Sequence, residues 1–323
     1  MISPPYFKSQ LAIFFILTVS VMNAFAAGPA RTTTRTLVID KARQSLVVFA
    51  DGRRQAEYPV SFGIDPVSDK YKAFDCATPE GLYFITYKNA ASRFHRSLGL
   101  SYPNLADAGR GLAFGVVSMA GYKRVREAVR ASRQPPCDTG LGCGIAIHGG
   151  GVYRDGVRDW TEGCVALDNA DMDTLFAAAR IGDAVVILNS ARNLFGLVRP
   201  FVHARDVDAH GLPICPDGAC FYELDLPTPL GIMRITVKEG KKYGRSIRVA
   251  IEGSHIPGEE LLTLTDRNAD GEISVLDSVG GVMAWGLSAE AAYGMVRGAV
   301  ATALSRGANL LTEIGRTRDG QSP

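Results

Sequence analysis

The chain has 323 residues, of which 46% are hydrophobic and 21% charged, so it can form one large domain or two ordinary ones with hydrophobic cores. Its formal net charge is only +2, and it contains no long basic run interleaved with aromatic residues. A nucleic-acid-binding protein is therefore not indicated.

The first 26 residues predict a signal peptide. Lys8 precedes an apolar run from Leu11 to Met22, and Ala24-Phe25-Ala26 supplies the small residues of a cleavage site. An uncleaved N-terminal anchor is the alternative. No later apolar stretch is long enough to span a membrane. We therefore expect an exported, periplasmic protein without a membrane span after cleavage.

The next part of the chain, residues 35–190, predicts a mainly β domain. Short apolar or alternating runs lie between turn-forming residues, at 36–40, 45–50, 55–62, 82–87, 144–148 and 184–188. Helices are expected at 122–132 and 170–180, the second capped by Asn169. These are too few for alternating β and α units, so we predict a largely antiparallel sheet folded into a sandwich or barrel.

The pattern changes after Ser190. Residues 191–229 carry several prolines and no clear period, which predicts a linker. Residues 230–323 predict a smaller α+β domain, with strands at 232–238 and 246–252 and a helix at 288–305 capped by Ser288.

Six cysteines in an exported protein predict disulfides. Two close pairs are evident, Cys137 with Cys143 and Cys215 with Cys220. Cys76 and Cys164 remain. They either bond to each other or leave Cys164 free to act as a nucleophile.

The most specific chemical signal is the segment IAIHGGGVYRDGVRDWTEGCVAL, which contains His148 and Cys164. A thiol beside an imidazole can become a thiolate at neutral pH, which suggests a covalent acyl-transfer enzyme. Gly149 follows the histidine and lets a substrate approach closely, and Gly163 can bring backbone N–H groups near the sulfur. The alternative is a structural histidine with a core cysteine.

Several separated motifs carry a family resemblance. His148-Gly149, the gap of fifteen residues between His148 and Cys164, and Thr161-x-Gly163-Cys164-Val165 resemble the signature of the L,D-transpeptidase catalytic domain of YkuD type. Further likeness, to the murein L,D-transpeptidase and L,D-endopeptidase branch, lies in Thr78-Pro79-Glu80-Gly81-Leu82-Tyr83, Ser92-Arg93-Phe94-His95 and Leu100-Ser101-Tyr102-Pro103-Asn104. The resemblance covers roughly residues 35–190.

The resemblance implies a reaction on peptidoglycan stem peptides. Cys164 would attack the carbonyl of diaminopimelate, expel D-alanine and pass the acyl group to an amine. His148 would be the general base, oriented by a backbone carbonyl at or near Gly149. Backbone N–H groups of Glu162, Gly163 and Cys164 would hold the oxyanion, and no cofactor would be needed.

Substrate-binding residues are expected around this pair, at Arg93, His95, Tyr102, Thr161 and Glu162. Glu162 stands where many family members have histidine, and Ala166 where arginine or asparagine is common.

Two other functions remain open. If water replaces the amine, the same residues make a hydrolase, an L,D-endopeptidase, carboxypeptidase or amidase, acting on cross-links or on a wall-attached protein. The third possible function is that of a non-catalytic protein that binds the cell wall.

A calcium loop is predicted in the second domain. Oxygen-bearing residues alternate around a glycine at Asp266, Asn268, Asp270, Glu272 and Asp277, as in an EF-hand-like loop. A solvated turn is the alternative. We expect any calcium there to be structural, because a thiol nucleophile needs no metal.

Overall fold

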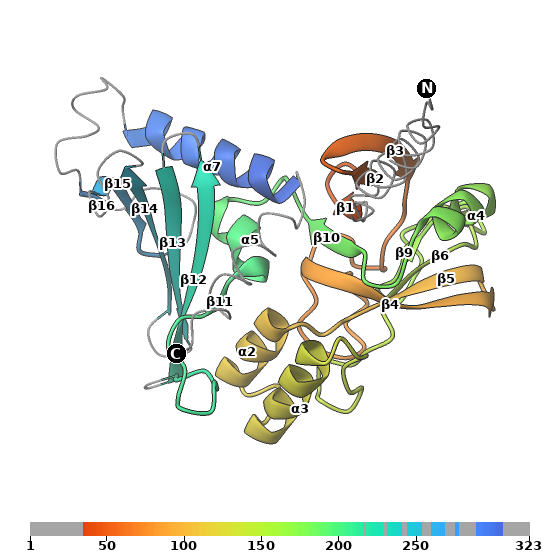
Figure 1. Ribbon diagram of the computed structural model, residues 1–323, viewed down its shortest axis with the longest axis horizontal. Coiled ribbons are helices and arrows are strands. Elements are labelled where there is room, and N and C mark those ends of the chain that lie inside the picture. The colour runs from red at the N-terminus through yellow and green to blue at the C-terminus, as the bar shows by residue number, and fades with distance from the viewer. Residues whose placement is uncertain are drawn as a thin grey trace, which may run out of the picture. The chain divides into compact units, whose positions relative to one another are not determined.

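The structure is a computed structural model that describes residues 35–215, 218–228, 231–240, 244–253, 260–268, 275–277 and 289–305. Within these residues the chain forms an eight-stranded sheet, a six-stranded sheet and a two-stranded hairpin, with helices packed against them (Figure 1). The prediction of a mainly β fold with a few helices is confirmed. The predicted signal peptide lies outside the described residues.

The eight-stranded sheet contains the predicted strands of the first domain. Across the sheet they run β3 (Arg53–Pro59), β2 (Ser45–Ala50), β1 (Arg35–Asp40), β10 (Ala184–Leu188), β4 (Gly81–Ser92), β5 (His95–Leu100), β6 (Ala146–His148) and β9 (Val165–Ala166). All neighbours are antiparallel except β1 with β10 and β6 with β9. Ser61, just after β3, exchanges two backbone hydrogen bonds with Ala166 of β9, so the two edges of the sheet approach each other as in a barrel.

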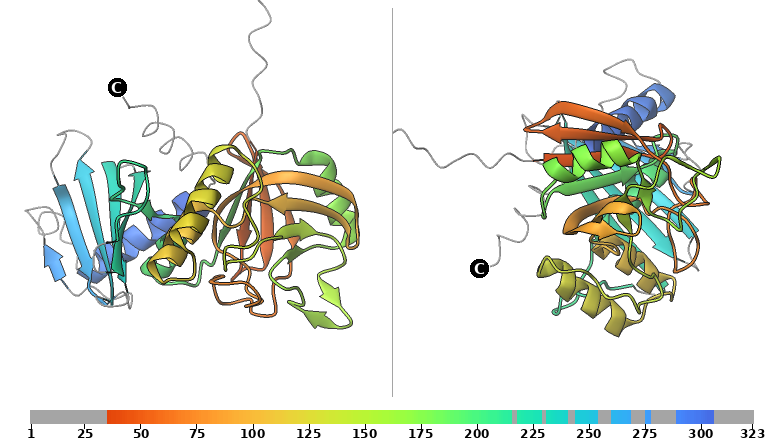
Figure 2. Two further views of the ribbon diagram at one scale, coloured as in Figure 1. Left: turned by 90° about the horizontal axis from the view of Figure 1, so that it is seen from below. Right: turned by 90° about the vertical axis from the view of Figure 1, so that its right-hand side faces the viewer.

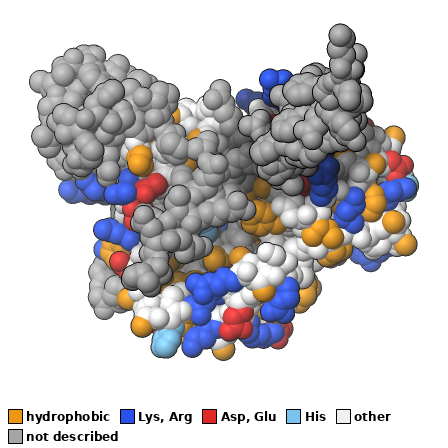
Figure 3. Space-filling model, in the orientation of Figure 1, with side chains coloured by type: hydrophobic (Ala, Val, Ile, Leu, Met, Phe, Trp, Pro, Cys, Tyr) orange, Lys and Arg blue, Asp and Glu red, His pale blue; other side chains and the backbone are white. Residues whose placement is uncertain are grey.

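The helices of this part are α2 (Leu105–Ala113), α3 (Met119–Arg130) and α4 (Asn169–Ala178). In α3, Tyr122 and Val125 are buried, whereas Lys123 and Arg124 are exposed, and basic side chains are visible over this helix in Figure 3. This is the amphipathic pattern that predicts the helix. It begins earlier than expected because the Ser118 side chain accepts from the Gly121 N–H and caps it.

The predicted cap of α4 is wrong by one residue. Asp168 is the N-cap residue, and Asn169 is the first helical one. Both side chains instead bind the glycine loop after β6: Asp168 Oδ1 accepts from Val152 N at 3.0 Å, and Asn169 Oδ1 from Gly150 N at 2.8 Å. The start of α4 therefore fixes the loop beside His148.

The predicted linker contains ordered elements. Residues 191–229 form α5 (Leu194–Val198), the 3-10 helix η1 (Arg199–Phe201), β11 (His203–Ala204) and β12 (Ala219–Thr228). The helix is too short to show a period in the sequence, and its apolar side chains are buried. Arg199, also buried, pairs with Glu239 at 2.9 Å, so the loop-like expectation for this stretch is wrong.

The six-stranded sheet is antiparallel throughout, in the order β11-β12-β13-β14-β15-β16. Its remaining elements are β13 (Gly231–Gly240), β14 (Gly244–Gly253), β15 (Glu260–Asp266), β16 (Val275–Asp277) and α7 (Ala289–Ser305). The α7 helix packs on one face of this sheet, with Val296, Val300 and Leu304 in the core (Figures 1 and 2). Val186 and Leu188 of β10 belong to the same core, so the two sheets share apolar contacts.

Both predicted disulfides are present, Cys137–Cys143 and Cys215–Cys220. Cys76 and Cys164 are free thiols, which answers the question that the sequence left open. No helix among the described residues is long and apolar enough to cross a membrane.

The predicted calcium loop lies largely outside the described residues, which include neither Asp270 nor Glu272. Asp266 ends β15, Asn268 lies in the bend after it, and Asp277 ends β16. These strands pair antiparallel, so the loop is flanked by strands rather than by the helices of an EF-hand.

Candidate active site

His148 ends β6, and Cys164 lies beside that strand. Ile147 pairs with Val165 and His148 with Ala166, so Cys164 directly precedes β9 beside the start of β6. Side chains two residues apart share a face of a strand, which places the histidine and the cysteine on the same side. With ordinary strand spacing their Cα atoms are about 8 Å apart, a separation that two side chains can bridge.

The glycine loop fixes the imidazole of His148. Its Nδ1 lies 2.6 Å from the carbonyl oxygen of Gly149, as the family resemblance implies. Because a carbonyl only accepts, Nδ1 carries the proton and Nε2 is left as the basic nitrogen. A Cβ at Gly149 would stand 2.6 Å from Asn169 Oδ1, so only glycine fits here.

A tight turn positions Cys164. The buried hydroxyl of Thr161 donates to the carbonyl of Cys164 at 2.7 Å and accepts from the N–H of Gly163 at 3.1 Å. Gly163 has φ +123°, and a Cβ there would be 2.7 Å from the carbonyl oxygen of Ala77. The N–H of Gly163 is thus engaged within the turn, contrary to the expectation that it faces an oxyanion.

We expect Gly163→Ala to lower the free energy of unfolding by about 2–4 kcal/mol, because it adds an unfavourable φ and a clash with backbone. Gly182→Ala is the matched control. Its φ is +90° and a Cβ added there would meet no atom within 4 Å, so it should cost only about 1–2 kcal/mol. Chemical denaturation followed by circular dichroism measures both. Equal losses would contradict the close contact at Gly163.

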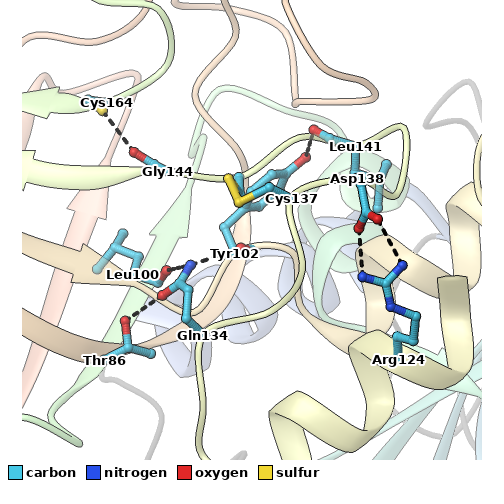
Figure 4. The surroundings of a disulfide bond; sticks show 11 residues. Thr86, Leu100, Tyr102, Arg124, Gln134, Cys137, Asp138, Leu141, Gly144 and Cys164 are labelled. Atoms are coloured by element: carbon cyan, nitrogen blue, oxygen red, sulfur yellow. Dashed lines mark hydrogen bonds and ion pairs between the residues drawn. A yellow bond between two sulfur atoms is a disulfide. The ribbon is translucent and has the colours of Figure 1, made fainter.

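The Cys137–Cys143 loop reaches Cys164 through Gly144. The Sγ of Cys164 lies 3.6 Å from the carbonyl oxygen of Gly144, the residue after the disulfide (Figure 4). The buried Tyr102 hydroxyl donates to the carbonyl of Leu141 in the same loop at 3.2 Å. The disulfide and the tyrosine therefore hold the loop against which the thiol packs.

Electrostatics favour an uncharged pair at rest. Burial raises the pKa of the Cys164 thiol above its ordinary 9.0, and nearby Glu162 raises it further. Burial lowers the pKa of His148 below its ordinary 6.5, and the positive charges of Arg93 and Arg154 add to this. Both shifts favour a neutral thiol beside a neutral imidazole, because both groups lose solvation on burial.

The expected substrate residues divide into two groups. Tyr102 is fully buried and Thr161 nearly so, and both support the backbone, so neither is exposed to a substrate. The His95 ring contacts Asp173 of α4 at 2.7 Å and is directed to that helix. Arg93 and Glu162 are exposed, and their charges act on Cys164.

Three residues near His148 were not singled out from the sequence. The ring of Phe94 stacks on the imidazole at 4.6 Å and 20°, and Trp160 lies 5.7 Å from it. Arg154 lies over both of these rings. Phe94 and Trp160 stand beside motif residues, but their contact joins segments far apart in the chain, so sequence spacing gave no signal for it.

A cavity of about 240 Å³ lies away from this pair, at the junction of α5 and η1. Its charged lining residues are Asp69, Glu80, Arg192, Arg199 and Arg245. The arginines pair with carboxylates, including Arg192 with Glu80 at 2.8 Å and Arg199 with Glu239. We therefore do not place the active site there.

Residues 34–187 match the model of the YkuD family, the L,D-transpeptidase catalytic domain. Comparison with curated proteins gives no match.

Among solved structures, an L,D-transpeptidase from Xylanimonas cellulosilytica is 18% identical, with a TM-score of 0.28, 53% of this chain covered and 68% of that one. An L,D-transpeptidase from Mycobacterium smegmatis is 14% identical, with a TM-score of 0.27, and the match covers 48% of this chain and 58% of that one. Bd1075 from Bdellovibrio bacteriovorus is 15% identical, with a TM-score of 0.32, and the match covers 70% of this chain and 90% of that one. The chain thus spans just over half of the M. smegmatis protein.

The family assignment comes from the match over residues 34–187, within which the histidine and cysteine motifs lie. Residues 34–187, just under half of the chain, are thus similar to the L,D-transpeptidase catalytic domain family.

Proposed function

We propose that the protein is a periplasmic peptidoglycan L,D-transpeptidase with Cys164 as nucleophile and His148 as general base. The observation that carries the proposal is the placement of His148 at the end of β6 and of Cys164 directly before the neighbouring parallel strand β9, with Nδ1 of the histidine bound to Gly149. The family match over the same residues supports the reaction class. The substrate is the stem peptide of peptidoglycan, with diaminopimelate as its third residue.

Acylation begins from the neutral pair. As Cys164 Sγ attacks the carbonyl carbon of diaminopimelate, its proton passes to Nε2 of His148. The amide bond to D-alanine then breaks, and the leaving amine takes the proton from Nε2. The product is a thioester on Cys164 beside a neutral His148.

Deacylation repeats these steps with an amine acceptor. The acceptor nitrogen attacks the thioester and gives its proton to His148, which returns it to the departing sulfur. We assign the oxyanion to the N–H of Cys164, because the N–H of Gly163 already binds Thr161. A preorganised donor of this kind typically contributes a factor of about 10²–10³ to the rate.

A hydrolase is the second proposal, because water can replace the amine in the second step without any change in Cys164 or His148. Incubating the protein with purified muropeptides in ¹⁸O-labelled water, followed by mass spectrometry, separates the two. Diaminopimelate-linked dimers free of label indicate transfer, and labelled carboxyl groups indicate hydrolysis. Unchanged muropeptides would contradict both and favour a wall-binding protein.

Calcium binding between β15 and β16 stays a separate proposal, based on Asp266, Asn268, Asp270, Glu272 and Asp277. A bound ion stabilises the folded state by mass action, by about 2.7 kcal/mol at one hundred times its dissociation constant. The midpoint of thermal unfolding should then be higher with calcium than with a chelator. An unchanged midpoint would favour a solvated turn.

A further inference from the structure

Two aromatic rings, those of Phe94 and Trp160, form an aromatic cluster beside the proposed base. Phe94 stacks on His148, and Trp160 meets the edge of Phe94 with 5.5 Å between ring centres. The indole N–H of Trp160 donates to the carbonyl of Gly151 at 3.1 Å, which connects the aromatic cluster to the glycine loop. Neither ring carries a charge or a free acceptor, so the aromatic cluster cannot itself neutralise the charge of a cation.

Two exposed guanidinium groups lie against this aromatic cluster. Arg93 is 4.7 Å from the ring centre of Phe94. Arg154, on the hairpin formed by β7 (Tyr153–Arg154) and β8 (Val157–Arg158), is 5.6 Å from the same ring and 5.0 Å from Trp160. The two cations come from segments some sixty residues apart and converge on one ring.

The pair has no counter-ion within the part of the chain that the structure describes. The neighbouring Arg96, by contrast, pairs with Asp173 at 2.7 Å. Neither Arg93 nor Arg154 forms an ion pair with a described residue. Two like charges against one ring repel each other, and an anion bound between them would remove that repulsion.

The geometry points to a carboxylate-binding site formed by Arg93 and Arg154, which selects substrates with a negative group beside the bond that Cys164 attacks. This inference rests on the proposed function. A guanidinium stacked on a ring keeps its in-plane N–H groups free, and their fork matches the two oxygens of a carboxylate. Arg93 was expected from its motif to bind substrate; Arg154 and the pairing come from the structure.

Two carboxylates of a stem peptide have this chemistry. One is on the side chain of diaminopimelate, and the other is the α-carboxylate of the leaving D-amino acid. The arginines lie next to His148, which would give its proton to the leaving amine. The α-carboxylate is two bonds from that nitrogen, so we assign it as the group that the pair binds.

The test compares three tetrapeptide stems: the free acid, its C-terminal carboxamide, and a stem with lysine in place of diaminopimelate. Arg154→Ala should lower kcat/KM for the free acid by about 10–100-fold, mainly through KM, because one charge-assisted contact is lost. It should leave the carboxamide unchanged and lower the lysine stem as much as the free acid. Arg154→Lys should recover part of the loss.

Arg53→Ala is the matched control, since Arg53 is an exposed arginine at the start of β3 and should not affect any of the three. A loss on the carboxamide but not on the lysine stem would assign the side-chain carboxylate instead. Equal losses on all three substrates, or none, would overturn the carboxylate site.

A binding measurement distinguishes failure of the carboxylate site from failure of the proposed enzymatic function. Calorimetry of Cys164→Ala with the free-acid stem needs no turnover, and adding Arg154→Ala should weaken this binding by about 10–100-fold. If wild-type protein turns over no stem yet this loss is seen, only the enzyme proposal fails. If turnover is normal and binding is unaffected by Arg154→Ala, only the carboxylate site fails.

Discussion

Cys164→Ala should reduce product formation from muropeptides by about 10⁴-fold or more, because the sulfur that would form the acyl intermediate is lost. The substitution removes one half-buried sulfur that contacts the carbonyl of Gly144, so the fold should be retained. Product formation is measured by chromatography and mass spectrometry of the digest, and folding by circular dichroism.

Cys76→Ala provides the matched control, since Cys76 is the other free thiol and is also half-buried. It should keep the wild-type rate, and the protein should still form an adduct with a thiol-reactive β-lactam. Normal product formation by folded Cys164→Ala would refute the proposed nucleophile.

His148→Gln should reduce the rate by about 10²–10⁴-fold, because general-base assistance is lost while the thiol remains. With a resting thiol, rather than a thiolate, the first step depends on a base to take the proton. His210→Gln, at an exposed histidine outside the eight-stranded sheet, should leave the rate unchanged.

The pH profile adds a second signature of His148. A base acts only when deprotonated, and burial lowers the pKa of this imidazole below 6.5, so the wild-type rate should stay high at neutral pH and fall only below that value. In His148→Gln the rate should instead rise toward alkaline pH, as the thiol with its raised pKa ionises. An acid limb that is the same in both proteins would assign it to another group.

Much of the first sheet could be predicted from the sequence. The strand at Ala184–Leu188 matches the expected residues, because it is a short apolar run between turns and is buried on both faces. The strand at His95–Leu100 was missed. It begins with exposed polar residues, and only its pairing with β4 and β6 defines it.

The glycine and cysteine motifs predicted the central pair because they are local backbone features. The contact of His148 Nδ1 with Gly149 involves adjacent residues, and the turn from Thr161 to Cys164 spans four. The chemical state of the pair was not predictable in this way. It depends on burial, which raises the thiol pKa and lowers that of the imidazole, and burial is a property of the packed fold.

The substrate residues show the same limit. Tyr102 stands in a family-like motif, yet it is a core residue that supports the disulfide loop. Arg154 lies in a stretch without a recognisable motif, yet it reaches the rings beside His148. A motif gives the residue type and position, whereas the direction of the side chain follows from tertiary packing.

Acylation of Cys164 by a stem peptide is the step on which the proposed function depends. Its most direct test is to mix full-length protein with a diaminopimelate tetrapeptide, quench in acid within the first turnovers, and map the adduct by peptide mass spectrometry. We predict a thioester on the peptide that contains Cys164, with the mass of the tripeptide acyl group and with D-alanine released in equal amount. Product formation with no adduct on Cys164, or an adduct on another residue, would contradict it.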